Sequence, residues 1–128
     1  MFETKQVSGT PDAIAPDGSE VRILCRTERG SMAQFTLPPG AVSRAVAHRT
    51  VEEVWCFIAG RGRIWRRHGG RDEVTEVGPG TSVSIPLGAW FQFRCDGDEA
   101  LVAVGVTMPP WPGEDEAYAV EGCWEPAS

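Results

Sequence analysis

Two side chains capable of acid–base chemistry lie close together in the sequence, His48 and Glu53. If both face one concave site, an imidazole and a carboxylate can divide the roles of proton donor and proton acceptor. The pair can also be purely structural, with the histidine at the end of a strand and the glutamate accepting its hydrogen bond or that of an arginine. Spacing alone leaves both alternatives open. The other histidine, His68, stands beside the glycine pair 69–70, where we expect a solvated loop residue.

Short strands separated by glycine and proline must position this pair. The segment 51–59 is rich in β-branched and aromatic residues and predicts a central strand. The glycine pair 69–70 accepts the positive φ angles of a two-residue turn and predicts a hairpin. No segment of ten or more residues shows the apolar period of a helix, so we expect an all-β fold. The expected strands cover residues 20–27, 31–37, 51–59, 61–67, 71–77, 81–85, 89–95 and 100–107.

The composition indicates one folded domain. The chain has 128 residues, of which 41% are hydrophobic and 23% are charged, as in ordinary globular domains. No apolar run approaches the roughly 20 residues of a membrane span, and the first residues do not resemble a signal peptide, so we expect a cytoplasmic protein with no membrane partner. A net charge of −6 with scattered arginines predicts no binding to nucleic acid. The four cysteines are far apart and are expected to be reduced thiols.

Three parts are expected along the chain: an N-terminal arm at 1–19, a barrel or sandwich at 20–107 and a C-terminal arm at 108–128. The C-terminal arm is rich in proline and carries Trp111 and Trp124. Because tryptophan side chains are rarely left in water, we expect this arm to pack on the barrel or on a partner subunit.

The glycines around the histidine and glutamate follow a recognisable spacing. Starting at Gly40, five residues precede Val46, one residue precedes His48, four precede Glu53 and six precede Gly60. This run resembles the first motif of the cupin superfamily, G-x5-H-x-H-x3-4-E-x6-G. It retains both glycines, the second histidine and the glutamate.

A second run has the same relation to the other cupin motif, G-x5-P-x-G-x2-H-x3-N. Here Gly80 is followed after five residues by Pro86, then by Gly88, Phe91 and Cys95 at the expected separations. The resemblance implies a small single-domain cupin of the bacterial type, with an antiparallel jelly-roll β-barrel.

The resemblance also implies a metal site of three histidines and one glutamate, but two of the histidine positions hold Val46 and Phe91. Neither side chain has a lone pair, so only His48 and Glu53 remain as ligands. We therefore expect a divalent transition metal to be weakly held or absent. The candidates for a replacement ligand near these positions are Gln34, Glu52 and Gln92, and a slip of one residue would bring Trp90 to the mouth.

Aromatic residues on the expected strands predict an apolar ligand pocket, with plain core packing as the alternative. Arg44 near the barrel mouth suits a bidentate contact with a ligand carboxylate, or it is simply solvated. The residues expected to line the pocket are Trp55, Phe57, Trp90, Phe91, Gln92, Phe93, Gln34 and Arg44.

Three functions are compatible with these residues. The leading hypothesis is a cupin that binds a small apolar or aromatic molecule, with no catalytic residue assigned. The second is a metal-dependent enzyme, similar to cupin dioxygenases, isomerases or polyketide-modifying proteins, with His48 and Glu53 as residual ligands. The third is an assembly module, because the resemblance implies a homodimer and the C-terminal arm can cover an exposed edge strand.

Overall fold

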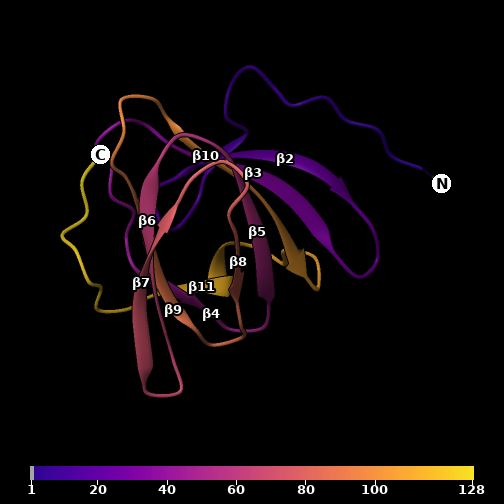
Figure 1. Ribbon diagram of the computed structural model, residues 1–128. Coiled ribbons are helices and arrows are strands. Elements are labelled where there is room, and N and C mark those ends of the chain that lie inside the picture. The colour runs from indigo at the N-terminus through magenta and orange to yellow at the C-terminus, as the bar shows by residue number, and fades with distance from the viewer. Residues whose placement is uncertain (1) are drawn as a thin grey trace.

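The computed structural model describes residues 2–128, which form two antiparallel sheets packed face to face (Figure 1). Sheet A has the strand order β1-β2-β3-β10-β5-β8, and sheet B has the order β11-β4-β9-β6-β7. The strands of sheet A are β1 (Ala13–Ile14), β2 (Glu20–Arg26), β3 (Ser31–Leu37), β5 (Glu52–Ala59), β8 (Ser82–Ile85) and β10 (Leu101–Met108). Those of sheet B are β4 (Val46–His48), β6 (Gly62–His68), β7 (Arg71–Val77), β9 (Trp90–Cys95) and β11 (Ala117–Ala119).

The all-β fold predicted from the sequence is confirmed, and each of the eight expected strands is present to within about one residue at either end. Three strands of two or three residues, β1, β4 and β11, were not predicted. They are too short to carry a pattern of their own, and pairing with other strands creates them, as where Ala117 of β11 lies opposite His48 of β4. A short 3-10 helix, Glu114–Glu116, precedes β11. No helix among the described residues has the length and apolar character needed to cross a membrane.

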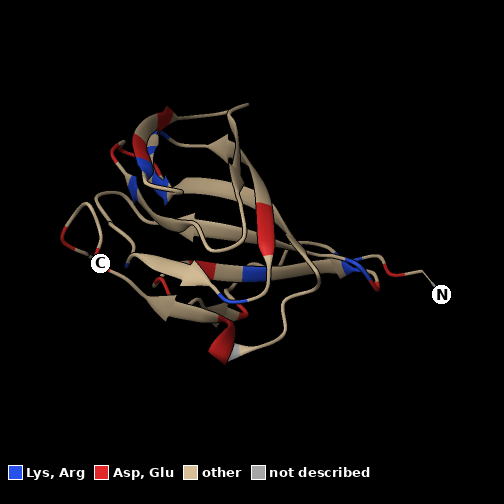
Figure 2. Cartoon of the chain, turned by 90° about the horizontal axis from the view of Figure 1, so that it is seen from below, with Lys and Arg blue, Asp and Glu red and all other residues tan. Residues whose placement is uncertain are grey.

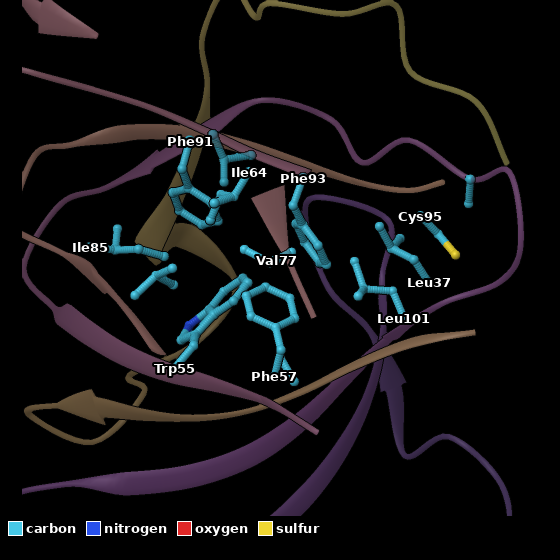
Figure 3. Close-up of a cluster of buried hydrophobic side chains, with 14 of the residues drawn as sticks. Leu37, Trp55, Phe57, Ile64, Val77, Ile85, Phe91, Phe93, Cys95 and Leu101 are labelled. Atoms are coloured by element: carbon cyan, nitrogen blue, oxygen red, sulfur yellow. The ribbon is translucent and has the colours of Figure 1, made fainter. Parts of the chain in front are cut away.

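Alternating side chains of the two sheets fill the barrel with aromatic rings. In β5 every second residue is buried, and Trp55 and Phe57 point from sheet A toward Phe91 and Phe93 of sheet B (Figure 3). The ring centroid of Trp55 lies 5.7 Å from that of Phe91 and 5.1 Å from that of Phe93, both edge to face. This packing of inward residues explains why the two sheets stay together.

Gly60 ends β5 where the backbone of another strand passes close by. Its φ is +81°, and a Cβ atom there would lie 2.3 Å from the carbonyl oxygen of Ala100. Gly40 has the same φ of +81° but open space around its Cα. Both alanine substitutions should therefore cost about 1–2 kcal/mol of backbone strain, while Gly60→Ala should cost about 1–3 kcal/mol more through the clash. Urea unfolding of the two variants measures the difference, and equal losses would contradict the close approach.

Candidate functional site

The structure brings together the two ionisable residues singled out from the sequence. His48 ends β4 in sheet B, and Glu53 lies near the start of β5 in sheet A, so the two side chains meet at one end of the barrel, here called the mouth. The Nδ1 atom of His48 lies 3.1 Å from Oε2 of Glu53. Both side chains are buried, with exposed fractions of 6% and 3%. They form a compact pair within the barrel rather than two solvated groups.

Polar side chains of sheet A surround the carboxyl group. The indole Nε1 of Trp55 donates to Oε1 of Glu53 at 3.2 Å. Thr107 lies opposite Glu53 in the pairing of β10 with β5, and its hydroxyl is 2.5 Å from that of Ser31 on β3. Thr107 and Ser31 were missed in the sequence analysis, because small hydroxyl residues in a strand carry no distinguishing signal.

Burial favours the uncharged form of both members of the pair. It raises the pKa of Glu53 from 4.5 to about 8; the hydrogen bond from Trp55 opposes this only in part, and the charges of Asp17 and Glu116 add to the increase. Burial also lowers the pKa of His48 from 6.5 to about 4, against a smaller opposing effect of Glu116. At neutral pH the pair is therefore a protonated carboxyl group beside a neutral imidazole.

Hydrogen bonding within the pair depends on the proton of Glu53. Nδ1 of His48 is shielded from solvent and is not aligned to donate an N–H hydrogen bond to the carboxyl oxygen of Glu53, 3.1 Å away. The protonated carboxyl group can instead donate its O–H to this nitrogen. If that proton is lost, the buried ring nitrogen is left without a partner, which commonly costs about 1–3 kcal/mol.

Two aromatic rings close over the imidazole. Phe91 of β9 and Trp111 of the C-terminal arm both contact His48 edge to face, with centroid distances of 5.3 and 5.1 Å. The backbone N–H of Trp111 donates to Oγ of Ser31 at 2.9 Å, which attaches the arm to the rim of sheet A. The mouth of the barrel is therefore covered jointly by a ring of β9 and by the C-terminal arm.

Glu116 attaches the next part of the arm. Its Oε2 accepts hydrogen bonds from the backbone N–H groups of Thr50 at 2.6 Å and Val51 at 2.9 Å, and its Oε1 accepts from the Thr50 hydroxyl at 2.5 Å. Burial alone would raise the pKa of Glu116, but these hydrogen bonds together outweigh it, and the pKa is lowered. An ionised carboxylate thus connects the arm to the loop between His48 and Glu53.

Gln92, which was predicted to line the ligand pocket, lies instead on the outer face of sheet B and binds the end of the arm. Its amide nitrogen donates to the carbonyl oxygens of Ser43 at 2.8 Å and Trp124 at 2.7 Å. Its amide oxygen accepts from the backbone N–H groups of Cys123 and Trp124 at 2.9 Å each. Because Phe91 and Phe93 take the inward positions of β9, the residue between them must point outward.

Three other residues predicted to line the pocket also lie outside the barrel. Trp90 has the same outward phase in β9 and lies beneath the guanidinium of Arg67 at 5.4 Å. Gln34 alternates with the inward residues of β3 and lies opposite Val104 on the outer face of sheet A. Arg44 is exposed and donates to the carbonyl oxygen of Pro16 at 3.3 Å. None of the three reaches the mouth.

The four other predicted residues do face the interior. Phe57 and Phe93 are fully buried in the core, while Trp55 and Phe91 lie between that core and the His48–Glu53 pair. Core packing therefore accounts for Phe57 and Phe93, and only Trp55 and Phe91 belong to the immediate surroundings of the pair.

The donor atoms at the mouth do not fit a transition metal of the usual cupin kind. The separation of 3.1 Å between Nδ1 of His48 and Oε2 of Glu53 suits two adjacent ligands of one ion, but such a site takes three or four protein donors. Within residues 2–128, no three histidine, cysteine or acidic side chains lie close enough together to supply them. Val46 and Phe91 occupy the remaining positions with carbon atoms alone, and none of the proposed replacement ligands on the outer faces fills the gap.

Known protein domains share this architecture. A family model described as a cupin domain matches residues 33–107, more than half of the chain. No match was found among curated proteins.

Solved structures of similar fold share little sequence with the chain. The capsular polysaccharide assembling protein CapF from Staphylococcus aureus is 24% identical with a TM-score of 0.69, over 84% of this chain and 33% of CapF. Oxalate decarboxylase from Bacillus subtilis is 19% identical with a TM-score of 0.70, over 84% of this chain and 29% of the enzyme. An uncharacterized protein with a double-stranded beta-helix domain from Klebsiella pneumoniae is 17% identical with a TM-score of 0.67, over 95% of this chain and 97% of its own.

These similarities concern the fold. The chain spans only 33% of the length of CapF and 29% of that of oxalate decarboxylase. The jelly-roll architecture predicted from the glycine and proline positions is confirmed.

Proposed function

Because the chain belongs to the cupin family, we propose that it is a small-molecule-binding domain in which His48 and Glu53 bind the polar group of a small aromatic ligand. The proposal rests on one observation. An indole ring, that of Trp111, already lies against this buried pair, and it comes from the C-terminal arm rather than from the barrel.

The surroundings of the pair select the chemical class of the ligand. The rings of Phe91, Trp55 and Trp111 make the mouth apolar, so a ligand gains most by burying a flat hydrocarbon surface there. The imidazole of His48 and the carboxyl group of Glu53 can each exchange hydrogen bonds with a bound molecule, which favours a ligand with one hydroxyl, carbonyl or N–H group. A charged group is disfavoured, because the site is buried enough to hold even its own carboxyl group neutral.

Replacing Trp111 with alanine tests the proposal directly. If the indole ring stands where a ligand binds, Trp111→Ala should leave a vacancy at the mouth that free indole fills. We expect indole to bind the variant saturably, to raise its melting temperature and to shift the NMR signals of the His48 ring. The double variant Trp111→Ala/Glu53→Leu lacks the carboxyl group as well. Its affinity for phenol should fall more than its affinity for toluene.

Trp124→Ala is the matched control, since Trp124 belongs to the same arm but lies on the outer face of sheet B between Arg63 and Arg94. That variant should not gain indole binding at His48. Failure of indole, phenol and toluene to move the His48 signals in Trp111→Ala would overturn the proposal.

A metal-dependent enzyme is the competing function, and Mn(II) centres are described for oxalate decarboxylase. Elemental analysis of protein purified without chelator separates the two. A near-stoichiometric transition metal that is lost in His48→Ala would favour the enzyme and contradict a binding site built on a neutral pair.

A further inference from the structure

A cleft lies outside the barrel, and the residues that line it differ from those at the mouth. The β6–β7 hairpin projects past the neighbouring strands (Figure 1), and its inner face looks onto the turn between β8 and β9. The cleft between them has a volume of about 280 Å³. The residues that line it are Arg66, His68, Arg71, Asp72, Glu73, Ser84, Pro86 and Ala89.

The alternation of β6 explains how basic side chains come to face this cleft. Ile64 points into the core, so Arg66 and His68 continue the same face beyond the barrel, and His68 lies opposite Arg71 across the glycine turn. Gly69 and Gly70 both have positive φ, which permits this tight reversal. Figure 2 shows basic and acidic segments close together on this hairpin.

Arg66 is held in place from two sides. One of its terminal nitrogens donates to the carbonyl oxygen of Ser84 at 3.0 Å, and the other donates to Oε1 of Glu73 at 2.9 Å. Its Nε is buried and makes no hydrogen bond to any described residue. The guanidinium is thus a fixed cation in the wall of the cleft, and fixing it in advance lowers the entropic cost of binding an anion.

The two other basic side chains are uncommitted. Within residues 2–128, no hydrogen bond or ion pair is found for the side chain of His68 or of Arg71. The acidic residues of the cleft, in contrast, are engaged, since Glu73 accepts from Arg66 and Asp72 accepts from the indole of Trp65 at 3.2 Å. The free donors of the cleft are therefore concentrated at the hairpin turn.

The opposite wall limits the kind of anion. Pro86 presents apolar atoms to the cleft, while Ala89 lies behind it in the buried core, so the cleft can cover the hydrocarbon part of a ligand as well as its charge. Asp72 and Glu73 disfavour a dianion such as phosphate, because their carboxylates would repel its second negative charge. We propose that this cleft binds a small organic monocarboxylate, with Arg71 and His68 contacting the carboxylate and Pro86 covering its apolar part.

The two histidines of the chain allow the two sites to be observed separately, since His48 lies at the mouth and His68 in the cleft. Benzoate is titrated into the full chain at constant pH and ionic strength, with benzamide as its uncharged counterpart and inorganic phosphate as the dianion. We expect benzoate to shift the ring signals of His68 saturably, with benzamide and phosphate binding at least about threefold more weakly.

Arg71→Gln supplies the test of position, and its exposed site makes misfolding a minor concern. It should weaken benzoate binding at least about threefold, while Arg29→Gln, an exposed arginine in another turn, should leave it unchanged. Equal binding of benzoate and phosphate, or an undiminished response in Arg71→Gln, would overturn the assignment. A shift of the His48 signals alone would also overturn it, while leaving the proposal for the mouth intact.

Discussion

Replacing Glu53 with glutamine should remove a loss of stability above pH 6.5 that we expect for the wild-type protein. In the unfolded chain Glu53 titrates near pH 4.5, whereas in the folded protein it keeps its proton up to about pH 8. Over that interval the folded state binds one more proton, so rising pH destabilises it by about 1.4 kcal/mol per pH unit for this group. His48 acts in the opposite direction between pH 6.5 and about 4, because there only the unfolded state is protonated.

The two contributions cancel between pH 4.5 and 6.5 and leave a plateau. Above pH 6.5 only that of Glu53 remains, and between pH 6.5 and 8 it should amount to about 2 kcal/mol of lost stability. In Glu53→Gln only His48 still titrates. The free energy of unfolding should therefore rise from pH 4 to 6.5, and this pair should cause no further change above pH 6.5.

Denaturant unfolding at a series of pH values measures these profiles. Glu52→Gln is the control, since the neighbouring glutamate is exposed and should keep the wild-type profile. If His48 and Glu53 formed an ion pair in the folded protein, Glu53→Gln would lower stability at neutral pH and would not flatten the alkaline limb.

Glu116→Ala should release the C-terminal arm from the mouth. The substitution leaves the N–H groups of Thr50 and Val51 without their carboxylate, and we expect a loss of about 2–4 kcal/mol in the free energy of unfolding. Trp111 should also become more exposed, because Glu116 attaches the segment that follows it. Hydrogen exchange at Val51 and quenching of tryptophan fluorescence by iodide measure the two effects.

The charge of Glu116 has its own pH signature. Because its pKa is lowered in the folded protein, the ionised carboxylate stabilises the fold above its ordinary pKa of 4.5, and this stability is lost as the pH falls through the lowered value. Glu116→Gln should abolish that loss. Asp115→Ala, at an exposed neighbouring position, should leave stability and quenching unchanged; an equal effect of both variants would indicate general fraying of the arm rather than a specific attachment.

Much of the barrel could be predicted because its signals are local. Gly60 must have a positive φ at a close backbone approach, and Gly88 likewise has a positive φ after Pro86, so these residue types mark their turns wherever the chain goes. The same spacing singled out His48 and Glu53 and left open whether they face one site; the structure brings their side chains together. The homodimer and the cytoplasmic location stay predictions.

The errors in the pocket arose from strand phase. In the segment Trp90–Cys95 one face carries two phenylalanines and a cysteine, and the other carries Trp90, Gln92 and an arginine, so the alternation favours the first face as the inward one. The predicted pocket nevertheless included residues of both faces. The structure follows the alternation, with Trp55 of the opposite sheet packed against both phenylalanines. Gln92 is then left outside, and there it binds the C-terminal arm.

Local residue types thus sufficed for the turns, the strands and the depletion of the metal ligands, since each depends on the conformational or bonding properties of a single side chain. The cover over the His48–Glu53 pair depends on contacts between residues far apart in the chain. Ser31 and Trp111 are 80 positions apart, and Thr50 and Glu116 are 66 positions apart. Only the folded chain brings these groups within hydrogen-bonding distance, and for that reason the neutral, aromatic-covered character of the mouth was decided by the tertiary structure.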